Sequence, residues 1–316
     1  MTNPDAANGV STNNIVEALL ATSCQRHGRR DYPMKKSAIL LVACPDRKGE
    51  VASIADFVYR HDGNILHADE HADEESGLFL MRVEFDPKDF DLDLADFGKH
   101  FAPVAEKFQM KWRLAQSSQR PRMIAFVSKY DHCLIDLLYR HQSGELACDI
   151  PLIISNHPDN QPLADFHKIP YAVVAITKDN KNQAEERIQA LITEHKADFM
   201  VLARYMQILS NNFVNRYPQR IINIHHSFLP AFVGARPYHQ AFERGVKLIG
   251  ATSHYVTEVL DDGPIIEQDV VRVSHQDTVE DLIRKGRDLE KVVLSRAVRL
   301  HIENRVLVYG NKTVVF

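Results

Sequence analysis

Cysteine is scarce in this sequence, and long apolar runs are missing. The four cysteines among 316 residues, Cys24, Cys44, Cys133 and Cys148, lie far apart and form no Cys-x-x-Cys pair. That spacing argues against a disulfide framework and against a zinc ribbon. No segment approaches the roughly 20 apolar residues that a membrane helix needs, and Asp5 stands where a signal peptide would be basic and then apolar. We therefore expect a cytoplasmic protein.

An excess of one charge sign is also absent. The chain has 38 Lys and Arg residues against 42 Asp and Glu residues, and the two signs are interspersed. No basic field exists that could attract nucleic acid or anionic lipid. Hydrophobic residues make up 45% of the chain, which is enough for a buried core and for two domains. We expect no nucleic-acid partner and no membrane partner.

The first compact pattern follows a polar N-terminal stretch. Residues 1–34 are rich in Asn, Ser, Thr and Gly and are interpreted as a loosely ordered tail. In residues 35–114 the spacing of apolar residues fits, in order, a strand, a helix, two strands, a helix and a strand. This order predicts a βαββαβ unit. The strands and helices are expected at 38–43, 51–58, 63–70, 77–85, 92–108 and 110–114. Residues 115–121 form a predicted linker.

A second domain is predicted from residue 122 to 316. Its first four strands are short and almost wholly apolar, and helical segments separate them, at 123–127, 149–154, 172–175 and 199–202. This pattern is typical of a doubly wound, mostly parallel Rossmann-like sheet, in which a ligand lies at the carboxyl ends of the strands. A helix at 278–302 and a final hairpin around Gly310 complete the domain.

Three polar residues of this domain carry the chemistry. Asn223 and His225 are two apart in a predicted strand and therefore point to one face, whereas His226 points away. A later strand runs into a Gly-Pro turn that can bring Asp261 against His225. An amide donor, an imidazole that titrates near neutrality and a carboxylate are the groups that acyl transfer requires.

These residues resemble the motif of the folate-dependent formyltransferase family, which includes the glycinamide ribonucleotide enzyme and the formylase of methionyl initiator tRNA. The motif pairs Asn-x-His with Leu-Asp-x-Gly-Pro, found here at 223–225 and 260–264. Residues 227–230 and Gly234 match the loop after the first element, so the likeness covers 122–272. The N-terminal unit, with residues 44–49 at its first turn, resembles an ACT domain, a regulatory module.

The resemblance implies a role for each matching residue. Asn223 would hold the formyl oxygen, His225 would stabilise the oxyanion, and Asp261 would manage the protons of water and of the leaving nitrogen. Pterin contacts are implied at Met206, Gln207, Leu209 and Val256. The substrate would be 10-formyltetrahydrofolate, with no tightly bound cofactor and no metal.

One departure from the family favours hydrolysis over transfer. Where the glycinamide ribonucleotide enzyme has a glycine-rich turn that cradles phosphate, residues 127–133 contain no glycine but include Tyr130 and Asp131. Water would then take the place of an amine, with Tyr238 and His239 narrowing the space, and the products would be tetrahydrofolate and formate. Two alternatives stay open: transfer to an unidentified amine, and a non-catalytic protein that senses a ligand through its N-terminal unit.

The ACT-like unit implies regulation. An amino acid such as glycine or methionine would bind at an interface between paired N-terminal domains, with Asp46 and Gly49 as candidate contacts at a helix N-terminus. Since such domains pair, a homo-oligomer is expected.

The remaining histidines and acids have simpler interpretations. His226, His239 and His254 are expected to be surface or core residues, and Asp262 to be a solvated acid. A zinc site is a rival hypothesis, but adjacent His225 and His226 would point to opposite faces of a strand, and no carboxylate has metal-ligand spacing from them. Cys133 and Cys148 are expected to be inert core thiols.

Overall fold

The computed structural model describes residues 36–231 and 236–316. The predicted tail at 1–34 and the family-motif residue Gly234 lie outside the described residues. Within the described part of the chain, no helix is both long and apolar enough to cross a membrane.

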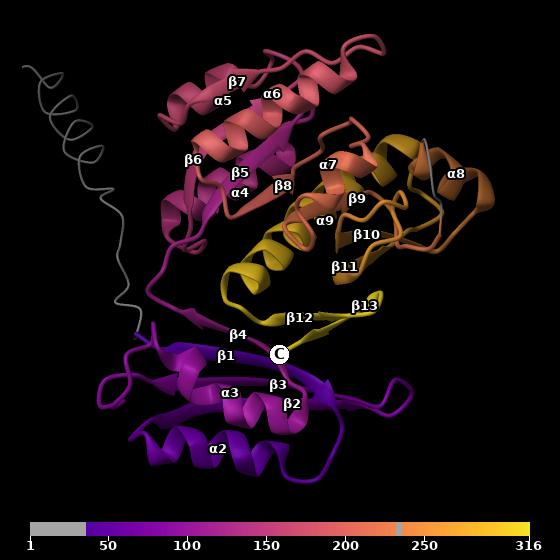
Figure 1. The fold of residues 1–316 in the computed structure, drawn as a ribbon. Helices are drawn as coiled ribbons and strands as arrows, with labels where there is room; N and C mark the ends of the chain where they lie inside the picture. The colour runs from indigo at the N-terminus through magenta and orange to yellow at the C-terminus, as the bar shows by residue number, and fades with distance from the viewer. Residues whose placement is uncertain (1–35, 232–235) are drawn as a thin grey trace, which may run out of the picture.

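The N-terminal unit is a four-stranded antiparallel sheet with two helices on one face (Figure 1). The sheet has the order β2-β3-β1-β4, and its elements are β1 (Ala38–Pro45), α2 (Glu50–Arg60), β2 (Asn64–Asp73), β3 (Leu78–Asp86), α3 (Phe97–Phe108) and β4 (Lys111–Gln116). Aromatic rings of Phe57, Phe97 and Phe101 meet edge to face or tilted in the core. The predicted βαββαβ order is confirmed, and β4 continues through Gln116, which pairs with Ala38.

The larger domain is built on a seven-stranded sheet with the order β11-β10-β9-β8-β5-β6-β7. Five strands are parallel: β5 (Arg122–Val127), β6 (Asp149–Ser155), β7 (Tyr171–Val173), β8 (Phe199–Leu202) and β9 (Ile221–His225). Two antiparallel strands, β10 (Leu248–Tyr255) and β11 (Ile265–Arg272), extend the sheet beyond β9. The predicted mostly parallel sheet is therefore confirmed.

Side chains of β5 alternate between two helical layers, as the strand period requires. Met123, Ala125 and Val127 pack with α4 (His132–Ser143), α5 (Gln161–Phe166) and α9 (Val279–Ile302). Ile124 and Phe126 pack on the other face with α6 (Lys181–Glu194) and α7 (Asn211–Asn215). The short helix α8 (Pro237–Arg244) lies at the edge of the domain beside α9 (Figure 1). This two-sided cover explains why the parallel strands are almost wholly apolar.

The chain ends in a hairpin that lies between the two sheets (Figure 1). The helix α9 starts with a capping box formed by Thr278 and Asp281. After it, β12 (Val306–Tyr309) and β13 (Lys312–Val315) pair around Gly310, as predicted. The Arg82 Nε of β3 donates to the Asn304 carbonyl oxygen at 3.1 Å, so the end of α9 is fixed to the N-terminal sheet.

Candidate active site

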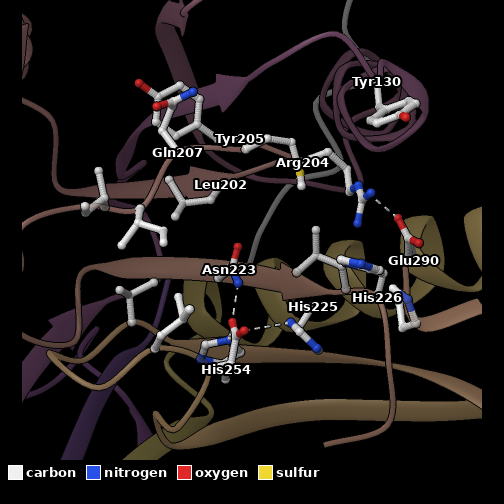
Figure 2. Close-up of a pocket in the computed structure, with 18 of the residues that line it drawn as sticks. Tyr130, Leu202, Arg204, Tyr205, Gln207, Asn223, His225, His226, His254 and Glu290 are labelled. Atoms are coloured by element: carbon white, nitrogen blue, oxygen red, sulfur yellow. Dashed lines mark hydrogen bonds and ion pairs between the residues drawn. The ribbon is translucent and has the colours of Figure 1, made fainter. Parts of the chain in front are cut away.

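A pocket opens along the carboxyl ends of β8 and β9, where the fold predicts a ligand. Its volume is about 590 Å³. Figure 2 shows Gln207 and Glu290 toward opposite ends of this pocket, with Asn223 and His225 between them. The pocket therefore has two arms that meet at the residues singled out by the sequence.

The structure brings Asn223, His225 and Asp261 together. Asn223 and His225 lie on β9, and Asp261 follows β10 in the loop at 256–264. The His225 Nδ1 is 3.2 Å from the Asp261 Oδ2 (Figure 2). Both side chains are largely buried, so this pair is shielded from solvent. The predicted approach of the Asp261 loop to His225 is confirmed.

Asp261 is held as a carboxylate. Burial by itself disfavours the charged form, but the hydrogen bond from His225 and the nearby His254 ring, 3.8 Å from the other carboxylate oxygen, outweigh it and hold the pKa of Asp261 below its ordinary value. The backbone of Asp261 adopts a φ of 57°, a left-handed conformation that is unfavourable for a residue with a Cβ atom. Gly263 is required by close packing, because an added Cβ would lie 1.7 Å from the Tyr255 carbonyl oxygen.

His254 belongs to this cluster, although we expected an ordinary surface or core histidine. Its Nδ1 lies 2.9 Å from the Tyr255 carbonyl oxygen, a contact that requires a proton on Nδ1. In the neutral ring Nε2 is then an acceptor, 3.3 Å from the Asn223 Nδ2. One N–H of the Asn223 amide is thereby engaged, and the second remains for another acceptor. No local sequence signal marked this role, because His254 sits directly opposite Asn223 only through the β9–β10 pairing.

The other nitrogen of His225 has no protein partner. Among the described residues, His225 Nε2 is a buried polar atom without a hydrogen bond. Because buried polar groups are normally paired, such an atom in a pocket wall is a candidate contact for a bound molecule. The Nδ1 contact to Asp261 fixes the ring so that Nε2 is the free position.

The expectation that His226 points away is wrong. Its ring stacks against that of His225 at a centroid distance of 5.2 Å, and it lines the same pocket. Strand β9 ends at His225, so the alternation of side chains does not extend to the next residue. Burial, reinforced by nearby Arg204, lowers the pKa of His226 to about 4, so its ring is neutral at physiological pH.

A second polar cluster surrounds Glu290 in the other arm of the pocket. The Glu290 side chain is 1% exposed; His132 Nε2 lies 2.8 Å away, the Tyr238 hydroxyl donates at 2.6 Å, and Arg204 Nε forms an ion pair at 3.5 Å. Burial disfavours the charge of Glu290, but these partners lower its pKa overall. The Arg204 guanidinium also lies 5.4 Å from the centre of the Tyr130 ring.

The Glu290 cluster contains a possible set of metal donors. Ligand atoms of His132, Cys133 and Glu290 lie within 4.8 Å of one another. However, Arg204 places a positive charge beside them, and burial holds the pKa of the Cys133 thiol well above its ordinary value. A cysteine binds a metal ion as its thiolate, and a positive charge beside the site repels a bound cation. The donor set therefore fits a hydrogen-bonded ion pair better than a cation site, and Cys133 fits the expected inert thiol.

The glycine-free segment at 127–133 is tied down by its own hydrogen bonds. The Ser128 N–H donates to the Arg204 carbonyl oxygen at 3.2 Å. Its hydroxyl donates to Asn156 Oδ1 at 2.6 Å and accepts from the Met206 N–H at 2.9 Å. Both donors of Ser128 are therefore engaged within the protein and are not free to bind a phosphate.

All four residues predicted to contact a pterin line the pocket. Met206, Gln207 and Leu209 follow β8, and Val256 follows β10, so they converge on one arm from two strands. Met206 is 53% exposed, which leaves an apolar side chain at the pocket mouth. The Met206 N–H is already engaged with Ser128, so its contact with a ligand would use the side chain.

The candidate effector residues lie in the N-terminal unit. Gly49 is the N-cap of α2 with a φ of 105°, which suits glycine, and the Asp46 N–H donates to the Gly77 carbonyl oxygen at 2.9 Å. The Glu50 side chain is buried in the first turn of α2 and accepts from the Arg47 N–H. An acid of the protein itself therefore already occupies part of this helix N-terminus.

The chain matches one protein family and is similar to curated proteins named formyltetrahydrofolate deformylase. The family described as formyl transferase matches residues 121–298. A formyltetrahydrofolate deformylase of Synechocystis sp. is 58% identical over 280 residues, which are 89% of this chain and 98% of the relative. A deformylase of Bacillus subtilis is 48% identical, with 88% and 93% of the two chains covered.

Solved structures differ in how much of this chain they match. A formyltetrahydrofolate deformylase of Pseudomonas syringae pv. tomato superposes with a TM-score of 0.87 at 49% identity, covering 96% of this chain and 99% of that one. A glycinamide ribonucleotide transformylase of Symbiobacterium toebii reaches a TM-score of 0.60 at 29% identity, covering 65% of this chain and 98% of its own. The likeness to this deformylase extends over both domains, whereas the likeness to the transformylase covers about the length of the larger domain. The chain therefore belongs to the formyltetrahydrofolate deformylases, whose catalytic domain is of the formyl transferase family.

Proposed function

We propose that Asn223, His225 and Asp261 hydrolyse 10-formyltetrahydrofolate to tetrahydrofolate and formate. The observation that carries the assignment is the buried His225 Nε2, which has no partner among the described residues while Asp261 holds Nδ1 on the opposite side of the ring. Asn223 and His225 line the same pocket. Together they can receive the oxygen of a formyl group as it becomes negative.

The reaction follows from these positions. A water oxygen attacks the formyl carbon, and the negative charge on the former carbonyl oxygen is stabilised by Asn223 and by a protonated His225. Asp261 accepts a proton from the water and returns one to N10 of the folate as the C–N10 bond breaks. The products are formate and tetrahydrofolate. Because Asp261 is ionised, it can act as the acceptor from the start.

The pterin ring is proposed to lie in the arm formed by Met206, Gln207, Leu209 and Val256. The apolar side chains of Met206, Leu209 and Val256 suit a flat heterocycle, and this arm meets the reacting groups at Asn223. The opposite arm, where a second substrate would approach, is lined by the paired side chains of Arg204 and Glu290, which we propose keep an amine out. A water molecule therefore fits beside the formyl carbon more readily than an amine does, which supports hydrolysis rather than transfer.

A formate-release assay with 10-formyltetrahydrofolate and no amine tests the function. The purified protein is expected to release one formate per folate, and Asn223→Ala, His225→Ala and Asp261→Ala are each expected to lose about 100- to 1000-fold in kcat. Asp262→Ala is the matched control, because Asp262 is the exposed neighbour of Asp261. Turnover that strictly requires an added amine would identify a transferase instead, and a normal rate in Asp261→Ala would contradict the mechanism.

Four finer features belong to the same proposal. The enzyme acts in the cytoplasm, without a tightly bound cofactor or a metal, and forms a homo-oligomer through its ACT-like N-terminal units. Glycine or methionine binds at those units near Asp46 and Gly49 and alters activity. Calorimetry with each amino acid and sedimentation of the full chain test these points; absence of binding for both ligands would remove the effector. Tight amino-acid binding without folate turnover would instead favour a sensor.

A further inference from the structure

The catalytic loop is joined to the C-terminal hairpin by two side-chain contacts. Asn311 Nδ2, at the tip of the hairpin, donates to the Asp262 carbonyl oxygen at 2.8 Å. Two residues further on, the Thr313 hydroxyl donates to the Ile265 carbonyl oxygen. These contacts hold the loop on the C-terminal side of Asp261, over a stretch of only a few residues.

This stretch needs external support. Asp261 has the left-handed φ of 57°, and such a backbone conformation persists in a non-glycine residue only when its surroundings impose it. Asp261 is also the residue whose carboxylate must remain 3.2 Å from His225. An unsupported peptide between Asp261 and Asp262 would relax toward an ordinary conformation and swing the carboxylate away from the imidazole.

The other side of the hairpin is fixed to the N-terminal unit. Lys312 Nζ lies 3.2 Å from Glu75 Oε2 and 3.6 Å from Asp73 Oδ2, at the turn between β2 and β3. Lys312 and Asn311 are neighbours on the same tip, one facing each domain. A shift of the β2–β3 turn would therefore displace Lys312 and, through its neighbour Asn311, the Asp262 carbonyl.

We propose that Asn311 is a positioning residue for Asp261, and that hairpin β12–β13 couples the N-terminal unit to the catalytic loop. Asn311 touches neither substrate nor reacting atoms; it acts by fixing the Asp262 carbonyl and with it the conformation of Asp261. Lys312 supplies the link to the N-terminal unit. This inference rests on the proposed role of Asp261.

The alternative is that the hairpin only closes the chain and contributes general stability. In that case Asn311→Ala would lower the unfolding temperature without a specific effect on kcat. Asn311 is exposed, so the variant is expected to fold. A positioning role instead predicts a kcat loss at an unchanged KM for the folate, because the pterin arm lies at Val256 and 206–209, away from the hairpin.

The test is a double-mutant cycle on the full chain, read by formate release. Asn311→Ala is expected to lower kcat about three- to tenfold, the scale of one hydrogen bond, with KM within about twofold. Asn311→Gln, which keeps an amide donor, is expected to recover part of the loss. In an Asp261→Ala background, Asn311→Ala is expected to have no further effect, since the residue it positions is gone.

Lys312→Ala tests the link to the N-terminal unit. It is expected to lower kcat by a smaller factor than Asn311→Ala does, and to leave the kcat of the Asn311→Ala variant unchanged. The proposal is overturned if Asn311→Ala keeps the wild-type kcat, or if it slows the Asp261→Ala enzyme by the same factor as the wild type. Wild-type formate release and its loss in Asp261→Ala test the proposed function separately, so the two failures are distinguishable.

Discussion

His225 and Asp261 form a buried hydrogen-bonding contact in which Nδ1 and Oδ2 lie 3.2 Å apart. Of the two nitrogens of the His225 ring, this contact leaves Nε2 to meet a molecule in the pocket. The contact also lowers the pKa of Asp261, which keeps the carboxylate charged at neutral pH. A neutral Asp261 would lose its ability to accept a proton from water. The geometry of this pair therefore underlies both oxyanion stabilisation and proton transfer, and several outcomes depend on it.

His254→Ala is expected to lower kcat about three- to tenfold, because the Asn223 amide loses the acceptor that fixes it and adopts other rotamers. His254→Gln, which keeps a polar side chain at this position, is expected to lose less. The measurement is steady-state formate release. His275→Ala, a change at an exposed histidine, is the control and is expected to match the wild type. Equal rates for His254→Ala and His275→Ala would show that Asn223 needs no such support.

Gly263→Ala is expected to reduce kcat about 100-fold. Its Cβ would lie 1.7 Å from the Tyr255 carbonyl oxygen, so the loop must move and carry Asp261 away from His225. A displacement of about 1 Å can cost this much in rate. Kinetics and thermal unfolding are measured together, with Asp262→Ala as the control in the same loop. A folded Gly263→Ala enzyme of normal kcat would show that the loop tolerates the shift.

Arg204→Gly is expected to open the second arm of the pocket. The backbone of Arg204 has a φ of 64°, which glycine adopts without strain, so the change removes the side chain and not the turn. With glycinamide present, the ratio of N-formylglycinamide to formate is expected to rise by about tenfold, as followed by mass spectrometry.

Arg287→Ala is the matched control for this change. Like Arg204, it places its guanidinium near the Tyr130 ring, 5.5 Å from the ring centre. Within the described residues, however, Arg287 forms no ion pair with Glu290. Its product ratio is expected to stay at the wild-type value. If Arg204→Gly still releases formate and forms no more formylated amine than Arg287→Ala, the arm does not decide the acceptor.

The free energy of unfolding is expected to fall between pH 7 and pH 5. Burial, with Arg113 nearby, lowers the pKa of His301 to about 4, below its unfolded value of about 6.5. The unfolded chain therefore binds the proton first as the pH drops, and the contribution present above pH 6.5 is lost progressively toward pH 4. His301 alone is expected to account for about 1 to 2 kcal/mol at pH 5.

His301→Gln removes this titration and can still hydrogen-bond the Tyr255 hydroxyl, which lies 2.8 Å from His301 Nδ1. Urea unfolding at the two pH values is expected to show a smaller difference for the variant than for the wild type. His275→Gln, at an exposed position, is the control. An unchanged pH dependence in His301→Gln would assign the effect to other groups, of which His226 is the first to examine because its pKa is also lowered.

Local pattern determined much of the fold. Apolar runs separated by helical periods predicted the parallel sheet, because strands covered on both faces have no polar side. The two-residue spacing of Asn223 and His225 predicted a shared face, and the Gly-Pro turn predicted the return of Asp261. These inferences depend only on neighbours in sequence and on strand geometry, which is why they were accessible. The resemblance to a family supplied the substrate class.

Other features of the site were decided only by the tertiary structure. His132 and Glu290 meet although 158 residues separate them, because α4 and α9 pack on the same face of the sheet. His254 reached Asn223 through strand pairing, and His226 joined the pocket because β9 stops one residue earlier. Asn311 came to the catalytic loop through a hairpin placed between two domains. The sequence alone determined which groups could do chemistry and that Asn223 and His225 share a face. The packing of distant elements decided which of these groups meet, since no local period records a contact between segments brought together by burial of a common core.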